Sequence, residues 1–152
     1  MEAIGSTSTT EAFRIAIADG HLAFRRNLKS FLVRRGDLDV VGEASEGREL
    51  CDLFERLALR NLVPHLIIID MSMLLHMEAH IPKVKMNFCG MNLLVLTNYD
   101  NPEYVNRARS IGAKGCLLKK DTAAEVFAAI EMIKLGGIYF PPHLDGGCSN
   151  RP

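Results

Sequence analysis

Two carboxylates, a hydroxyl and an amine each stand at the end of an apolar run in this sequence: Asp19, Asp70, Thr97 and Lys119. This set of groups suits the transfer of a phosphoryl group to a carboxylate. An exposed aspartate can accept the group as an acyl phosphate, while a hydroxyl and an ammonium stabilise the phosphoryl oxygens. A second carboxylate helps to hold Mg²⁺, whose usual ligands are carboxylates, carbonyls and water.

The elements that must position these side chains can be predicted from the hydrophobic pattern. Five short apolar runs predict buried β-strands, at residues 13–18, 39–44, 65–70, 92–97 and 115–119. Between the runs, apolar residues recur three or four positions apart, which is the spacing of one helix face. Alternating strands and helices predict a parallel sheet covered on both faces. Because parallel strands end at the same edge, the four polar side chains should meet there.

Two of the predicted helices have distinctive sequence signals. Asn101-Pro102 predicts a helix start, with asparagine as N-cap and proline in the first turn, and Gly112 predicts its end. The third helix is expected within residues 74–87, where Pro82 must shorten or kink it.

Composition indicates one globular domain without an electrostatic preference for nucleic acid or membranes. The 152 residues are 48% hydrophobic and 24% charged, and the formal net charge is zero. Four scattered cysteines, without a signal peptide or an apolar run of membrane-spanning length, favour a reducing cytoplasmic location. We expect a disordered leader at 1–12, a folded domain at 13–140 and a flexible tail at 141–152.

Four stretches of the sequence together resemble a known family. They read IADGHLAFR, LIIIDMSM, LLVLTNYDNPEYVNRARSIGAKGCLLKKDTAAEVFAAI and GGIYF, and they span about residues 13–140. They resemble the response-regulator receiver domain of two-component signalling, in particular receivers that precede a LuxR-type helix-turn-helix. The resemblance implies a flavodoxin-like (CheY-like) α/β fold, with a five-stranded parallel sheet in the order 2-1-3-4-5 and helices on both faces.

The same resemblance implies a role for each site residue. Asp70 would be the phosphoacceptor, Thr97 the switch hydroxyl and Lys119 the lysine that pairs with the phosphoryl group. Asp19, Asp70 and the backbone carbonyl of Ser72 would be the protein ligands of Mg²⁺. The phosphodonor would be a histidine kinase or a phosphotransfer protein. No enzyme activity is implied beyond Mg²⁺-dependent self-phosphorylation and dephosphorylation.

The sequence departs from the family pattern in three places. Gly20 replaces the second of two adjacent acids, which predicts a weakened Mg²⁺ site. Met73-Leu74-Leu75 replaces Met-Pro-Gly, and Cys116 replaces the aromatic switch residue. The resemblance therefore implies an atypical receiver. An alternative is a degenerate pseudo-receiver that acts as a phosphorylation-independent interaction module. A nucleotide- or flavin-binding fold is a third alternative, although the first strand is followed by no glycine-rich loop.

The resemblance also implies where output partners bind. The expected surface is built by the fourth and fifth helices around Tyr104, Arg107 and Lys120, and it could serve a homodimer or an unknown downstream protein. No helix-turn-helix follows the receiver in this sequence, so we expect no direct DNA binding by this chain and no membrane contact.

Overall fold

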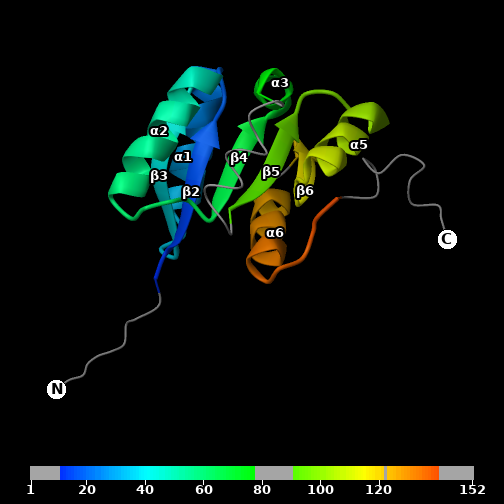
Figure 1. Cartoon of the computed structure of the whole chain (residues 1–152). Coiled ribbons are helices and arrows are strands. Elements are labelled where there is room, and N and C mark those ends of the chain that lie inside the picture. The colour runs from blue at the N-terminus through cyan, green and yellow to red at the C-terminus, as the bar shows by residue number, and fades with distance from the viewer. Residues whose placement is uncertain (1–10, 78–90, 122, 141–152) are drawn as a thin grey trace.

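A five-stranded parallel β-sheet forms the centre of the computed structural model, which describes residues 11–77, 91–121 and 123–140. Its strands lie in the order β3-β2-β4-β5-β6, which is 2-1-3-4-5 in chain order (Figure 1). The strands are β2 (Phe13–Ala18), β3 (Leu38–Ala44), β4 (Leu66–Asp70), β5 (Asn92–Thr97) and β6 (Gly115–Leu118). The predicted fold class is confirmed.

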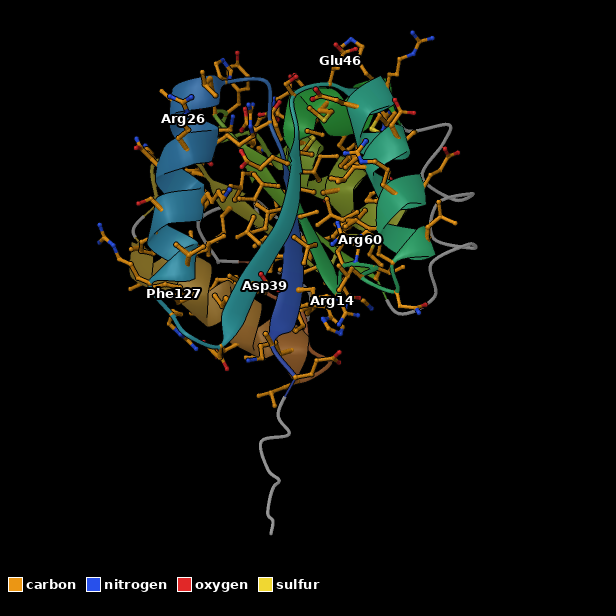
Figure 2. All side chains as sticks on the ribbon, turned by 90° about the vertical axis from the view of Figure 1, so that its left-hand side faces the viewer. Arg14, Arg26, Asp39, Glu46, Arg60 and Phe127 are labelled. Atoms are coloured by element: carbon orange, nitrogen blue, oxygen red, sulfur yellow. The ribbon has the colours of Figure 1, made fainter. Side chains whose placement is uncertain are left out.

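Helices cover both faces of this sheet. They are α1 (Leu22–Val33), α2 (Gly47–Leu59), α3 (Met71–His76), α5 (Pro102–Ile111) and α6 (Ala123–Lys134). Buried residues of α1 and α6 pack in one hydrophobic cluster, and those of α2, α3 and α5 pack in another. Figure 2, viewed toward the β3 edge, shows α1 and α2 on opposite sides of that strand.

Alternation along the strands explains the two clusters. In β2, Ile15 and Ile17 face α1 and α6, whereas Ala16 and Ala18 face the opposite side. All five residues of β4 are buried, as expected for a central strand of a parallel sheet.

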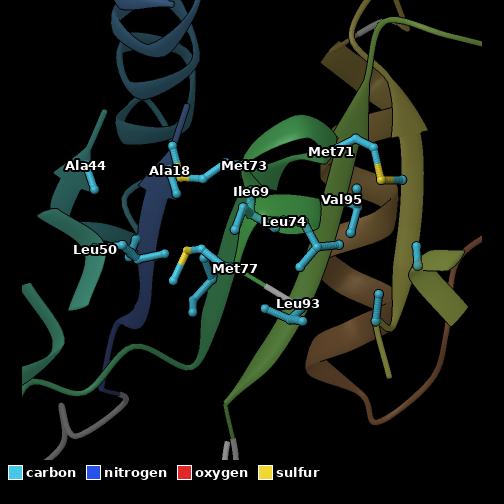
Figure 3. Packing of buried hydrophobic residues seen from close by; sticks show 14 of the residues in the cluster. Ala18, Ala44, Leu50, Ile69, Met71, Met73, Leu74, Met77, Leu93 and Val95 are labelled. Carbon is cyan, nitrogen blue, oxygen red and sulfur yellow. The ribbon is translucent and has the colours of Figure 1, made fainter. Parts of the chain in front are cut away.

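Methionines in α3 and directly after it fill the core on the face of the sheet that α2, α3 and α5 cover. Met73 and Met77 are buried, and Figure 3 shows both beside Ile69 of β4. An unbranched thioether adapts to irregular gaps between a short helix and a sheet. This packing holds α3 against the strand that ends in Asp70.

The position of α3 corrects one prediction. The helix was expected within residues 74–87, whereas the described helix begins at Met71, directly after β4, and residues 78–87 of the predicted range lie outside the described residues. Asp70 is its N-cap, because the carboxylate Oδ2 accepts hydrogen bonds from the backbone N–H of Ser72 (3.1 Å) and Met73 (3.4 Å). Pro82 lies outside the described residues.

The predicted boundaries of α5 are confirmed. The Asn101 side chain accepts a hydrogen bond from the backbone N–H of Glu103 at 2.9 Å, and Pro102 is the first helical residue. Gly112 ends the helix with φ 98°, a left-handed conformation that glycine adopts without a Cβ penalty.

The chain after α6 returns to the sheet. Tyr139 N–H donates to the Lys114 carbonyl (2.8 Å), and Cys116 N–H donates to the Tyr139 carbonyl (3.2 Å). The Tyr139 hydroxyl lies 3.0 Å from each carboxylate oxygen of Glu125 on α6. The Arg109 guanidinium of α5 lies 4.0 Å from the centre of the Phe140 ring. Residues 137–140, here named the return segment, thus cover the outer edge of β6 and contact both neighbouring helices.

The predicted leader and tail fall almost entirely outside the described residues. Among the residues that the structure describes, no helix combines the length and apolar character needed to cross a membrane.

Candidate functional site

Three of the predicted site residues meet at the carboxyl edge of the sheet. Asp19 follows β2, Asp70 ends β4 and Lys119 follows β6. The Lys119 ammonium lies 2.6 Å from Asp19 Oδ2 and 2.7 Å from Asp70 Oδ1. The exposed fractions of these side chains are only 3% for Asp19, 11% for Asp70 and 7% for Lys119. The lysine therefore bridges two largely buried carboxylates.

Asp70 is less exposed than expected for a phosphoacceptor. Both of its carboxylate oxygens have partners, since Oδ1 pairs with Lys119 and Oδ2 caps α3. Burial alone would raise the pKa of Asp70, but its interactions with Lys119 and with the start of α3 hold that pKa below its usual value. Asp70 is therefore a carboxylate at neutral pH, which is the form that acts as a nucleophile.

Thr97 lies at the same edge without touching the ion pairs. Its buried hydroxyl accepts a hydrogen bond from the Tyr99 N–H (3.1 Å), and its carbonyl accepts one from the Lys119 N–H (2.8 Å). Thr97 and Asp70 both line a pocket of about 220 Å³, together with His21 and Tyr99. Asp70 and Thr97 thus share one pocket.

Asp19 is fixed from several directions. Its Oδ1 accepts a hydrogen bond from the backbone N–H of His21 (2.8 Å), and Nδ1 of the His21 ring lies 3.2 Å away. Its backbone carbonyl accepts a hydrogen bond from Arg25 at 2.6 Å. The ring of Phe24 completes the site, with its centre 4.7 Å from Lys119 Nζ.

Neither His21 nor Phe24 was identified from the sequence. An aspartate side chain often accepts a hydrogen bond from the backbone N–H two residues later. This turn pattern could have drawn attention to His21. Phe24 lies in the first turn of α1, only five residues after Asp19, and this proximity in the sequence could have drawn attention to it.

The residues predicted to hold Mg²⁺ do not fit that ion in this arrangement. Lys119 occupies the space between the two carboxylates, and Gly20 supplies no side-chain oxygen. The Ser72 carbonyl lies inside α3 and accepts a hydrogen bond from Nδ1 of His76 at 2.7 Å. Within residues 11–77, 91–121 and 123–140, no three His, Cys, Asp or Glu side chains are arranged to hold a metal ion.

The aromatic switch position is filled by a buried thiol. Cys116 in β6 is fully buried, and burial raises its pKa to about 12. A neutral thiol packed in the sheet is inert and lacks the large ring that could turn between two orientations.

The predicted partner surface lies on α5 and just after β6. Arg107 and Lys120 are exposed, whereas Tyr104 is half-buried and its ring centre lies 5.8 Å from that of Tyr99. Because Tyr99 and Tyr104 both line the Asp70 pocket, this surface continues into the site.

Curated relatives of this chain are bacterial transcriptional regulators. The chain is 35% identical over 128 residues to the "Uncharacterized transcriptional regulatory protein YhcZ" of Bacillus subtilis, an alignment that covers 83% of this chain and 56% of that protein. It is 30% identical over 130 residues to the "Transcriptional regulatory protein UhpA" of Salmonella typhimurium, covering 86% and 63%. The chain thus spans between half and two thirds of the length of these relatives.

Solved receiver domains share the fold. The isolated REC domain of RcsB from Salmonella enterica serovar Typhimurium, determined with the phosphomimetic BeF₃⁻, matches with a TM-score of 0.73 and 22% identity, covering 88% of this chain and 96% of that chain. The signal receiver domain of the putative response regulator NarL from Mycobacterium tuberculosis matches with a TM-score of 0.67 and 27% identity, covering 83% and 98%.

A family model described as "Response regulator receiver domain" matches residues 15–131, which is most of the chain and includes every site residue named above. The sheet order agrees with that match. The chain therefore belongs to the response regulator receiver domain family of two-component signal transduction.

Proposed function

We propose that this receiver accepts a phosphoryl group on Asp70 from a histidine kinase or a phosphotransfer protein and signals through protein–protein contact. The observation that supports this assignment best is the 2.7 Å ion pair between Lys119 and Asp70, beside a pocket that Thr97 also lines. It combines a carboxylate nucleophile with a cation and a hydroxyl that can meet phosphoryl oxygens.

The chemistry assigned to these residues is one substitution at phosphorus. The P–N bond of a donor phosphohistidine breaks, a P–O bond to the Asp70 carboxylate forms, and the imidazole leaves. Lys119 then neutralises charge on the transferred group, and the Thr97 hydroxyl donates to one of its oxygens. One carboxylate oxygen of Asp70 must first give up a partner, so we expect slow phosphorylation.

Receiver domains of this family generally bind Mg²⁺ at an acidic site. We propose that this site is weakened here, because Gly20 takes the place of an acid. Losing a ligand should reduce metal affinity by at least the ~10–100-fold that losing a partner of a ligand costs.

Response regulators of this family act with histidine kinases and are signalling proteins rather than enzymes. We propose that output uses the surface around Tyr104, Arg107 and Lys120, toward a second copy or another protein. A cytoplasmic location and the lack of direct DNA binding by this chain remain predictions from the sequence.

Phosphorylation can be tested by mass spectrometry. The purified chain is incubated with phosphoramidate and millimolar Mg²⁺, and its intact mass is followed over time. We expect a slow gain of one phosphoryl group, because the acceptor, hydroxyl and lysine are present. Borohydride reduction should locate the group on the peptide that carries Asp70.

The matched control is Asp70→Asn. Its amide oxygen can still cap α3, so the fold should remain, whereas the nucleophile is lost. An unchanged mass for the wild-type chain, or labelling of Asp70→Asn at the wild-type rate, would reject the assignment.

The second candidate is a phosphorylation-independent docking module. The engaged oxygens of Asp70 and the buried thiol at the switch position favour it. It predicts that Asp70→Asn leaves partner binding unchanged, which a pull-down with an identified partner would measure.

A further inference from the structure

The Lys119 ammonium is enclosed on several sides. Asp19 and Asp70 lie within ion-pair distance of it, and the Phe24 ring of α1 lies 4.7 Å from it. An aromatic face attracts a cation most strongly where water is excluded. A lysine at a strand end normally keeps its charge in water, so this burial requires a specific explanation.

Compensation of charge explains the burial. A buried ammonium is costly unless it is paired, and here two carboxylates pair with it. The space between the two carboxylates is therefore filled by a positively charged group that contacts both of them.

The oxygens around this cation are already engaged by the protein. Oδ1 of Asp19 accepts from the His21 N–H, and Oδ2 of Asp70 accepts from the Ser72 N–H. The remaining carboxylate oxygen of each aspartate contacts Lys119. A divalent ion would have to displace the ammonium and break a second contact, and Gly20 offers no side-chain ligand in return.

We infer that Lys119 is the resident cation of this site, held against Phe24 and neutralising the acid pair in place of Mg²⁺, and that Gly20 determines this preference. The inference concerns the unphosphorylated protein. It holds whether or not Asp70 accepts a phosphoryl group, so its test uses Mg²⁺ alone.

A larger residue at Gly20 needs a local shift of a few tenths of an ångström but no unusual backbone conformation. The φ of Gly20 is not in the left-handed region, and a Cβ at this position would lie 3.3 Å from the Ser45 carbonyl oxygen. Gly20 also lines a pocket that includes Asp70 and Ser72, so a carboxylate there would enter the site. Asparagine has the same shape without the charge and provides the control.

The experiment is a calorimetric titration of Mg²⁺ into the full chain and its variants. We expect no saturable binding at millimolar Mg²⁺ for the wild-type chain or for Gly20→Asn. Gly20→Asp should bind at least ~10-fold more tightly than either, in line with the effect of one ligand on metal affinity. Equal affinity of the wild type and Gly20→Asp would overturn the inference.

A second measurement observes the lysine directly. In a ¹⁵N-lysine sample, the buried Lys119 ammonium should exchange slowly and give a signal that Mg²⁺ does not shift in the wild type. The same signal should move in Gly20→Asp when Mg²⁺ is added. Displacement of the wild-type signal by millimolar Mg²⁺ would show that the ammonium yields to the metal and would contradict the proposal.

Discussion

Lys119 shows how one residue can decide the charge state of a site. Its ammonium forms ion pairs with two carboxylates that lie at the ends of different strands. Its backbone N–H donates a hydrogen bond to the Thr97 carbonyl. Removing either acid would leave the buried Lys119 ammonium with only one carboxylate partner. Removing one partner of a buried ion pair is strongly destabilising.

The pH dependence of stability follows from these pairs. Because the pKa of Asp70 is lowered from 3.8 in the fold, its contribution is present above pH 3.8 and is lost as pH falls through the lower, folded value. Because the pKa of Lys119 is raised from 10.5, its contribution is full below pH 10.5 and is lost as pH rises through the higher value. Urea unfolding across pH should therefore give a plateau between these limits.

Asp70→Asn tests the acid limb of that profile. The variant should lose less stability than the wild type on acidification, because it has no carboxylate to protonate at this position. Identical acid limbs in the two proteins would show that Asp70 does not carry the effect.

At the residue scale, sequence reasoning could predict which groups converge but not how they pair. Parallel strands end at one edge, so the meeting of Asp19, Asp70 and Lys119 followed from the strand pattern. The position of the ammonium between the acids depends on side-chain rotamers and on Phe24, which no spacing rule encodes.

At the scale of elements, α3 and the return segment were the features that the sequence did not predict. Propensity placed the third helix too late, because the N-cap role of Asp70 competes with its assignment as a strand end. The long, periodic helices and the five apolar strands were predicted well. A strand buried on both faces gives a continuous apolar run, and a helix buried on one face gives a regular apolar spacing.

The return segment should contribute measurably to stability. Phe140→Ala removes the ring stacked on Arg109 and part of a hydrophobic contact, so the free energy of unfolding should fall by about 1–2 kcal/mol. Hydrogen exchange at the Cys116 N–H, which donates to the Tyr139 carbonyl, should become faster. Urea unfolding and exchange mass spectrometry measure both effects.

Leu135→Ala is the matched control. This side chain lies directly after α6 and close in sequence to the return segment, but it is 84% exposed. Its free energy of unfolding should stay within about 0.5 kcal/mol of wild type. Equal effects of the two substitutions would show that the return segment is not held by Phe140.

At the scale of the whole molecule, a single sheet separates two cores. Leu32 of α1 is fully buried on one face and Leu74 of α3 on the other. Because every strand contributes to both clusters, a destabilising substitution on one face should lower the stability of the entire domain.

Leu32→Ala and Leu74→Ala should each lower the free energy of unfolding by about 2–5 kcal/mol, the range for buried leucines. Circular dichroism and tyrosine fluorescence should report one coincident transition for each variant. Leu59→Ala, at an 87% exposed position of α2, is the control and should change stability by less than about 0.5 kcal/mol. Two separate transitions would mean that the faces unfold independently.

The return segment also makes the two sides of the sheet unequal toward other molecules. On the β6 side, Tyr139 already uses backbone groups of Lys114 and Cys116 that an incoming strand would need. On the opposite side, β3 is the terminal strand of the described sheet, and the labelled Asp39 lies along it (Figure 2). Extension of the described sheet from one molecule into the next would therefore have to start at β3. Negative charge such as that of Asp39 on each copy would repel there, which opposes the growth of a fibril.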